Sequence, residues 1–265
     1  GSQTEMGIML LIGIVSLDSL GILLAGWTSN NKYSLLGAIR SAAQLVSYEI
    51  PLGLTILSVV LISGSLNLQD ISIQQGIFAT ETQYLFGLKS IGIDVTKAGG
   101  FLSWNVVRMP LFFLLFILYF IASLAEANRA PFDIPEAESE LVGGFHTEYA
   151  GMRWALLFLS EYGMMLLVSV LGVILFWGSW YSPLPNIGSV RLADWTNGEP
   201  GTLSATILGF FWIMLKSYIL IGLQMWIRWT LPRLRVDQLM YLCWKVLTPF
   251  ALIFVAISAV WSLLM

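Results

Sequence analysis

Six apolar runs of about twenty residues limit this chain to a narrow set of folds. A helix of that length crosses the hydrocarbon core of a bilayer, which is about 30 Å thick. The composition agrees, because only 11% of the 265 residues are charged, against roughly 25% in a soluble domain. The runs lack the period-two alternation of a transmembrane β-barrel. The sequence therefore predicts an all-α fold, a polytopic transmembrane helix bundle in a single domain, residues 1–265.

The predicted spans distribute the connections between two sides of the membrane. Lys and Arg favour the cytoplasmic side, and eight of them lie on one side against four on the other. This difference places the connection 126–153 on the cytoplasmic side, or its topological equivalent, and the long connection 64–101 on the opposite side. Residues 68–78 fit either a short amphipathic helix or a plain surface loop. The six spans are residues 6–27, 39–63, 102–125, 154–180, 203–229 and 241–264.

The chain lacks the residues that bind a redox centre or a nucleotide. Cys243 is its single cysteine, so the chain can neither form an internal disulfide nor supply the thiolates of an iron–sulfur cluster. It has no Gly-rich dinucleotide loop, no phosphate loop and no metal-spaced set of His and Cys. No basic run suggests nucleic acid. If the protein acts in a redox system, the electron carriers belong to other chains.

Ionisable residues nevertheless occur inside the predicted spans, where each costs roughly 2.5–3.5 kcal/mol on insertion scales. One interpretation makes them structural ion-pair or hydrogen-bond partners, and we favour it for Asp18 and Lys216. The other is a proton relay, because burial moves the pKa of a carboxyl group toward neutrality. Both interpretations stay open for Glu49 and Glu161.

Three prolines also fall inside the predicted spans. Each removes a backbone donor and frees the carbonyl four residues earlier. Such a site is either a packing kink or a polar, hydrated one. The prolines are Pro51, Pro110 and Pro249, and the freed carbonyls are those of Ser47, Val106 and Lys245.

The connection 126–153 concentrates six of the sixteen acidic residues. Carboxylates this close cannot all ionise at their ordinary pKa, so their protons become mobile and coupled. Pro135 is placed to begin a short helix, and Gly143 and Gly144 would end it. Aromatic residues follow, so the connection suits a cavity for an amphipathic ligand, although a solvated charged loop stays open. The acidic residues are Glu126, Asp133, Glu136, Glu138, Glu140 and Glu148.

Three stretches of the chain resemble one family. The first is EANRAPFDIPEAESELVGGFHTEYAGMR, residues 126–153. The others are AGWTSNNKYSLLGAIRSAAQLVSYEIPLG, residues 25–53, and LPRLRVDQLMYLCWKVLTP, residues 231–249. They resemble the quinone-site membrane subunit of respiratory complex I, called subunit 1, or the H subunit in bacteria. Together with the 64–101 connection, the sequences of these three stretches look closest to the A subunit of the NAD(P)H dehydrogenase-like complex of cyanobacteria and chloroplasts.

The resemblance implies a non-redox subunit of a proton-translocating quinone oxidoreductase, which helps to enclose a quinone tunnel and begins a path of buried carboxylates. By position, that path would use Glu49, Glu126, Asp133, Glu136, Glu138, Glu140, Glu148 and Glu161. The quinone cavity would be lined by Arg129, Phe132, Phe145, His146, Tyr149 and Arg153.

The implied partners are the lipid membrane, quinone and the other subunits of the complex, including the peripheral iron–sulfur arm. In photosynthetic relatives the quinone is plastoquinone, ferredoxin donates electrons through other subunits, and the membrane is the thylakoid. Members of the family have eight spans, whereas six are predicted here. This chain would begin near the third, so one wall of a quinone tunnel would lie outside these residues.

Two other classes of protein fit the same buried acids. A stand-alone, proton-coupled secondary transporter is one, although the chain shows no internal repeat. The membrane anchor of an energy-converting hydrogenase, or a purely structural connector, is the other. Activity of the isolated chain would favour a transporter, and tightly bound quinone would favour the quinone-tunnel subunit.

Overall fold

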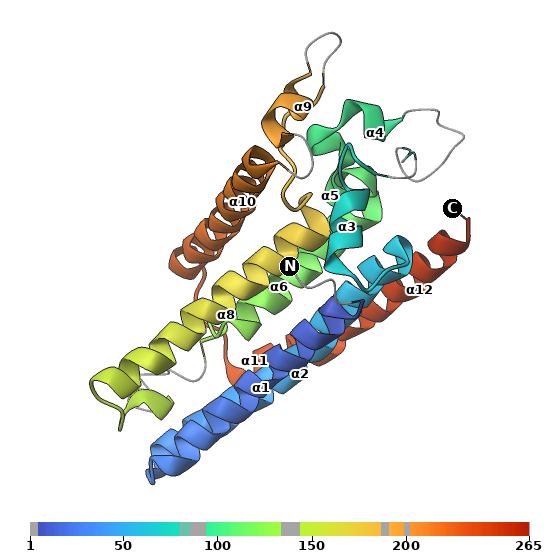
Figure 1. Ribbon diagram of the computed structural model, residues 1–265. Coiled ribbons are helices and arrows are strands. Elements are labelled where there is room, and N and C mark those ends of the chain that lie inside the picture. Colours follow the sequence, from blue (N-terminus) through green and yellow to red (C-terminus); the bar gives the residue numbers. More distant parts are fainter. Residues whose placement is uncertain are drawn as a thin grey trace.

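The computed structural model describes residues 5–79, 82, 84, 94–133, 144–186, 191–198 and 202–264, and these ranges form helices and no strand. Figure 1 shows an elongated bundle in which the long helices run roughly along one direction. This confirms the predicted all-α polytopic bundle. Within the described residues, five helices are long and apolar enough to cross a membrane, and a shorter one accompanies them. They are α1 (Gly7–Thr28), α2 (Lys32–Ser63), α8 (Met152–Phe176), α10 (Leu203–Thr230), the continuous helix Val236–Leu263, and the shorter α6 (Pro110–Glu126).

The continuous C-terminal helix has three parts: α11 (Val236–Tyr241), the π-helical η5 (Leu242–Leu247) and α12 (Thr248–Leu264). The short elements are α3 (Leu68–Gln74), α4 (Val95–Ala98), η3 (Gly100–Ser103), α5 (Asn105–Arg108), η4 (Gly144–His146) and α9 (Leu192–Asn197). Of these, α3, α4, α5 and α9 gather at the end of the bundle opposite the α1–α2 connection (Figure 1). The helical alternative for residues 68–78 is therefore correct over α3.

The second long helix begins earlier than predicted. It starts at Lys32 because Asn31 caps it, its Oδ1 accepting a hydrogen bond from the Tyr33 amide at 3.0 Å. Its 32 residues span about 48 Å, which exceeds a bilayer core. It ends at Gly64, whose φ of 67° suits glycine. The seven extra residues carry α2 beyond its apolar run.

The third span differs from the prediction at Pro110. A continuous helix from residue 102 was expected, with Pro110 inside it. Instead Pro110 is the first residue of α6, and Met109 is extended at φ −121° and ψ 115°. A proline disfavours helical backbone at the preceding residue and suits the first helical position. Pro110 therefore does not interrupt a continuous helix, and the predicted release of the Val106 carbonyl inside such a helix does not apply.

The other two prolines do lie inside helices, and each has a structural accommodation. The Ser47 carbonyl, freed by Pro51, accepts a hydrogen bond from the Cys243 thiol at 3.1 Å. Cys243 belongs to the π-helical turn that precedes Pro249, and its own carbonyl accepts from Thr248 Oγ1 at 2.8 Å. The wider π-helical turn therefore contacts α2 beside Pro51, and the carbonyl that Pro51 frees takes part in a packed polar contact between two helices.

The centre of the bundle lies where α2, α6, α8 and the C-terminal helix meet. Phe112 and Tyr119 of α6 pack on Phe176 of α8, and the Tyr119 hydroxyl donates to the Val168 carbonyl at 2.7 Å. By contrast, α10 contacts mainly α8 and exposes large apolar side chains, with Trp229 83% accessible. Such exposure is stable where acyl chains replace water as the solvent.

Candidate functional site

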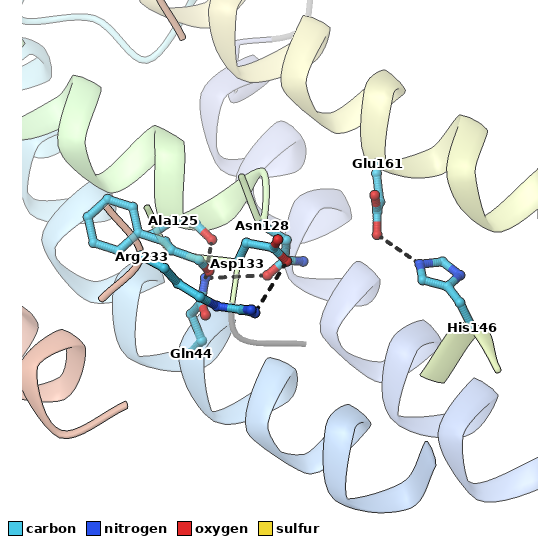
Figure 2. A network of polar contacts seen from close by, with 8 residues as sticks. Gln44, Ala125, Asn128, Asp133, His146, Glu161 and Arg233 are labelled. Atoms are coloured by element: carbon cyan, nitrogen blue, oxygen red, sulfur yellow. Dashed lines mark hydrogen bonds and ion pairs between the residues drawn. The ribbon is translucent and has the colours of Figure 1, made fainter. Parts of the chain in front are cut away.

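A buried ionic cluster joins the acidic connection to α8. Glu161 of α8, only 7% exposed, lies 3.9 Å from Arg129 Nη2 and 3.3 Å from His146 Nε2. The Arg129 guanidinium stacks over the ring of Tyr162, 4.2 Å from its centroid. Arg129 follows α6 and His146 belongs to η4, so residues from both described ends of the connection meet one carboxylate. Figure 2 shows the contact between His146 and Glu161. The cluster therefore brings a guanidinium, an imidazole and a carboxylate into contact inside the protein.

A second polar network holds the first part of the connection against α2 (Figure 2). The buried amide of Gln44 donates to the carbonyls of Ala125 and Phe132, at 2.8 and 2.9 Å. Its third contact, with Asn128 Oδ1, is longer at 3.4 Å. These bonds satisfy carbonyls at and beyond the end of α6, where intrahelical donors are missing.

Two further contacts hold this segment from the side of the 231–235 connection. Arg233 approaches Asp133 at 4.0 Å, and the Leu234 amide donates to the Pro131 carbonyl at 3.1 Å. The ring of Tyr48 packs on Phe132, with 5.6 Å between centroids. Residues 127–133 are thus held between α2 and the segment that precedes α11.

Two predicted path residues face a small internal cavity. Glu126 and Glu49 line it together with apolar residues of α1, α2 and α8, and its volume of about 10 Å³ is the space of about one water molecule. Glu126 is 4% exposed, and within the described residues its Oε2 has no hydrogen-bond partner. The charges that act on Glu126 are those of Glu49 and Asp18, and Glu161 in turn acts on Asp18. The four carboxylates therefore form an electrostatically connected series.

The end of the connection lines an open hollow of about 680 Å³, formed with the end of α1. Tyr149 and Arg153 contribute to it, and the Tyr149 hydroxyl donates to the Ala25 carbonyl at 2.7 Å. Glu148 is exposed there and accepts from Asn31 Nδ2 at 2.7 Å. The same asparagine caps α2, so its side chain ties the connection to that helix.

Known proteins resemble this chain over almost its whole length. A family model described as NADH dehydrogenase matches residues 1–259. This chain belongs to the NADH dehydrogenase family. Among its relatives, an NADH-quinone oxidoreductase H subunit of Cytophaga hutchinsonii, the one numbered 2, is 59% identical, over 98% of this chain and 73% of that protein. The NADH-quinone oxidoreductase H subunit of Chlorobaculum parvum is 49% identical over 98% and 65%, and that of Polaromonas naphthalenivorans 42% over 98% and 64%.

Family membership confirms the resemblance to the H subunit, or subunit 1, of complex I. The chain spans about two thirds of the length of most of these relatives. The relatives named here are bacterial H subunits, so the closer likeness to the photosynthetic A subunit stays a prediction.

The residues that the sequence analysis expected at the quinone cavity and on the proton path lie in several distinct places in the structure. Arg129, His146 and Glu161 form one cluster, whereas Tyr149 and Arg153 line the open hollow. Among the expected quinone ligands, Phe132 and Phe145 are buried side chains of the interior. Their roles stay predictions. Three expected acids, Glu136, Glu138 and Glu140, lie outside the described residues, as does the short helix expected from Pro135.

Sequence reasoning missed several residues that organise this candidate site. Gln44, Asn128 and Tyr162 contact its members, and Arg233 was used only in the charge count. Inserting an uncharged amide into a membrane span costs less free energy than inserting a charged group. Gln44 is therefore only a weak sign of a functional position in the sequence. The proximity of Arg233 to Asp133 joins segments 100 residues apart, which no local pattern shows.

The two other charges predicted inside spans have different outcomes. Lys216 Nζ donates to the carbonyls of Trp177, Ser179 and Tyr181, so its favoured structural role is supported. Asp18 makes no hydrogen bond or ion pair within the described part of the chain, and its charged neighbours are two other carboxylates, Glu161 and Glu126. The structural pairing favoured for Asp18 is therefore not supported.

Proposed function

We propose that this chain is the non-redox, quinone-site membrane subunit of a proton-pumping NADH-quinone oxidoreductase. In this role it associates with the other subunits of the complex, including the iron–sulfur arm, and with the membrane. The proposal is supported by the family of the chain and by the names of its relatives. Three finer points stay predictions: plastoquinone as the substrate, ferredoxin as the electron donor and the thylakoid as the membrane. They rest on the three stretches of sequence that resemble the photosynthetic A subunit, together with the 64–101 connection.

The observation that supports the proposal is a series of four carboxylates inside the bundle, of which Glu126 and Glu161 are buried and Glu49 and Asp18 are half-buried. Like charges repel one another strongly in a medium of low polarity, so a change of charge at one carboxylate is felt at its neighbours. Glu161 also contacts Arg129 and His146, which belong to the two ends of the acidic connection. This contact links the series to the side on which quinone would be reduced.

The proposed mechanism therefore assigns proton handling to this chain. Reduction of a quinone beside the connection consumes protons and changes the local charge. The Arg129–Glu161–His146 cluster responds by redistributing its proton, and the change propagates through Asp18, Glu126 and Glu49. The cavity between Glu126 and Glu49 has space for one water, which would bridge the two carboxylates.

The test is Glu126→Gln in the assembled complex, with protons pumped per quinone reduced as the readout. Glutamine keeps the size of the side chain and removes the titration, so pumping should fall while the complex still assembles. Asp70→Asn is the matched control, because Asp70 is an exposed carboxylate at the opposite end of the bundle. Unchanged pumping in the assembled Glu126→Gln complex would remove Glu126 from the path and refute the proposed role of the series.

A further inference from the structure

Gln44 holds two peptide carbonyls with a single buried amide. Gln44 is 1% exposed, and its Nε2 donates to the Ala125 carbonyl oxygen at 2.8 Å and to the Phe132 carbonyl oxygen at 2.9 Å. A carboxamide nitrogen carries two protons, so the two short bonds use both. Since both partners are carbonyl oxygens, they accept only from the nitrogen, and this sets the orientation of the amide.

The two carbonyls have a particular place in the sequence. Ala125 directly precedes Glu126, and Phe132 directly precedes Asp133. A peptide unit is planar, so holding its carbonyl oxygen also holds the Cα of the next residue. The one amide of Gln44 therefore positions the backbone of both acids that open the acidic connection.

The same face of α2 also contacts the other described end of the connection. Gly37 lies seven residues before Gln44, which is about two helical turns. A Cβ on Gly37 would lie 3.0 Å from Gly144 Cα, so α2 and the start of η4 are in close backbone contact. The η4 turn carries His146 to Glu161. Both described ends of the connection thus rest on one helix, which also carries Glu49.

We propose that Gln44 is a positioning residue for proton transfer, because its amide sets the separation of Glu126 and Asp133 from each other and from Glu49. This inference rests on the proposed function and deepens it. Gln44 itself neither gains nor loses a proton. Its loss releases the start of the connection from α2, so the charge change at the quinone side reaches Glu126 less effectively.

The experiment uses Gln44→Met in the assembled complex, because methionine has similar length and no donor. We expect the protons pumped per quinone reduced to fall about threefold, which lies within the range for residues that modulate coupling between sites. The KM for quinone should stay within about twofold. Gln44 lies outside the open hollow, whose lining includes Tyr149 and Arg153, two of the residues expected at the quinone cavity. Gln44→Asn keeps the donors on a shorter side chain and should lower pumping in the same direction by less.

Gln224→Met is the matched control. Gln224 is also a buried glutamine, on α10, but its amide contacts the Ser123 hydroxyl at 3.5 Å and no peptide carbonyl in the described part of the connection. It should pump as the unmodified complex does. Native pumping in Gln44→Asn and Gln44→Met, or an equal loss in Gln224→Met, would overturn the positioning role. Should Gln44→Met fail to assemble, Gln44→Asn decides the matter by the same criterion.

A double variant separates this inference from the proposed function. If Gln44 acts through Glu126, then Gln44→Met should add no loss of pumping to Glu126→Gln. Additive losses would show an independent, structural effect and overturn the positioning role alone. If Glu126→Gln pumps normally while Gln44→Met does not, the carboxylate path fails and Gln44 acts elsewhere.

Discussion

Lys216 offers the sharpest test of how this bundle is stabilised. Its ammonium donates to the carbonyls of Trp177, Ser179 and Tyr181, at 2.8, 3.0 and 2.6 Å, and the residue is 6% exposed. These carbonyls follow the end of α8, where the helix no longer supplies donors. The same ammonium lies 4.2 Å from the ring centroid of Trp104. One side chain of α10 thus caps α8 and joins the two helices.

The perturbation is Lys216→Met, which keeps the length of the side chain and removes the charge. Each lost bond from a charged donor is worth about 1.5–3 kcal/mol, so their sum is an upper bound. Methionine avoids the desolvation of the ammonium, which costs several kcal/mol, but it leaves three carbonyls unsatisfied at about 1–3 kcal/mol each. Interhelical bonds in bilayers average less than this, about 0.6 kcal/mol. We expect the free energy of unfolding to fall by about 2–4 kcal/mol.

The assay is reversible unfolding in bicelles, read through a conformation-sensitive probe. Lys32→Met is the control, because Lys32 is exposed at the start of α2, and surface substitutions stay within about 0.5 kcal/mol. If Lys216→Met were as stable as that control, the three bonds would contribute nothing net, and the capping argument would be refuted.

Three further predictions concern packing inside the bundle. Tyr119→Phe removes one buried hydroxyl bond to a carbonyl of α8 and should lower the unfolding free energy in bicelles by about 1 kcal/mol, and no change would contradict the value of that bond. Gly76→Ala places a Cβ against the Tyr181 ring, where there is no room for it, and should cost about 3 kcal/mol by thermal unfolding. Gly53→Ala, with open space around it, should not destabilise. The fully buried Cys243 thiol should resist maleimide in the folded protein and react after denaturation, as followed by mass spectrometry, and rapid labelling of the folded protein would contradict its burial.

Several features of the fold follow from local rules. The membrane spans can be predicted from the sequence because the thickness of the bilayer sets a minimum length for an apolar run that crosses it. The start of α2 at Lys32 depends on the Asn31 cap, and the break before α6 depends on Pro110. Both signals are present in the sequence, but a long apolar run obscures them when hydrophobicity alone sets the boundary.

The candidate site shows the opposite case. The sequence identifies acids that are costly in a membrane, such as Glu49 and Glu161, because charge in a span is rare. It does not show which of them meet, since Glu126 and Glu49 share a cavity only when α2 and α6 pack together. Gln44 is the clearest example, because its importance appears only with the two carbonyls that lie more than 80 residues away.

By itself, then, the order of residues determined the all-α class, the number of apolar segments and the family, because helices in lipid satisfy their own backbone within one segment. Tertiary structure alone decided which polar groups inside the bundle have partners. Where water is excluded, a buried donor or carboxylate is stabilised only by a partner on another helix, and such partners come from distant parts of the chain.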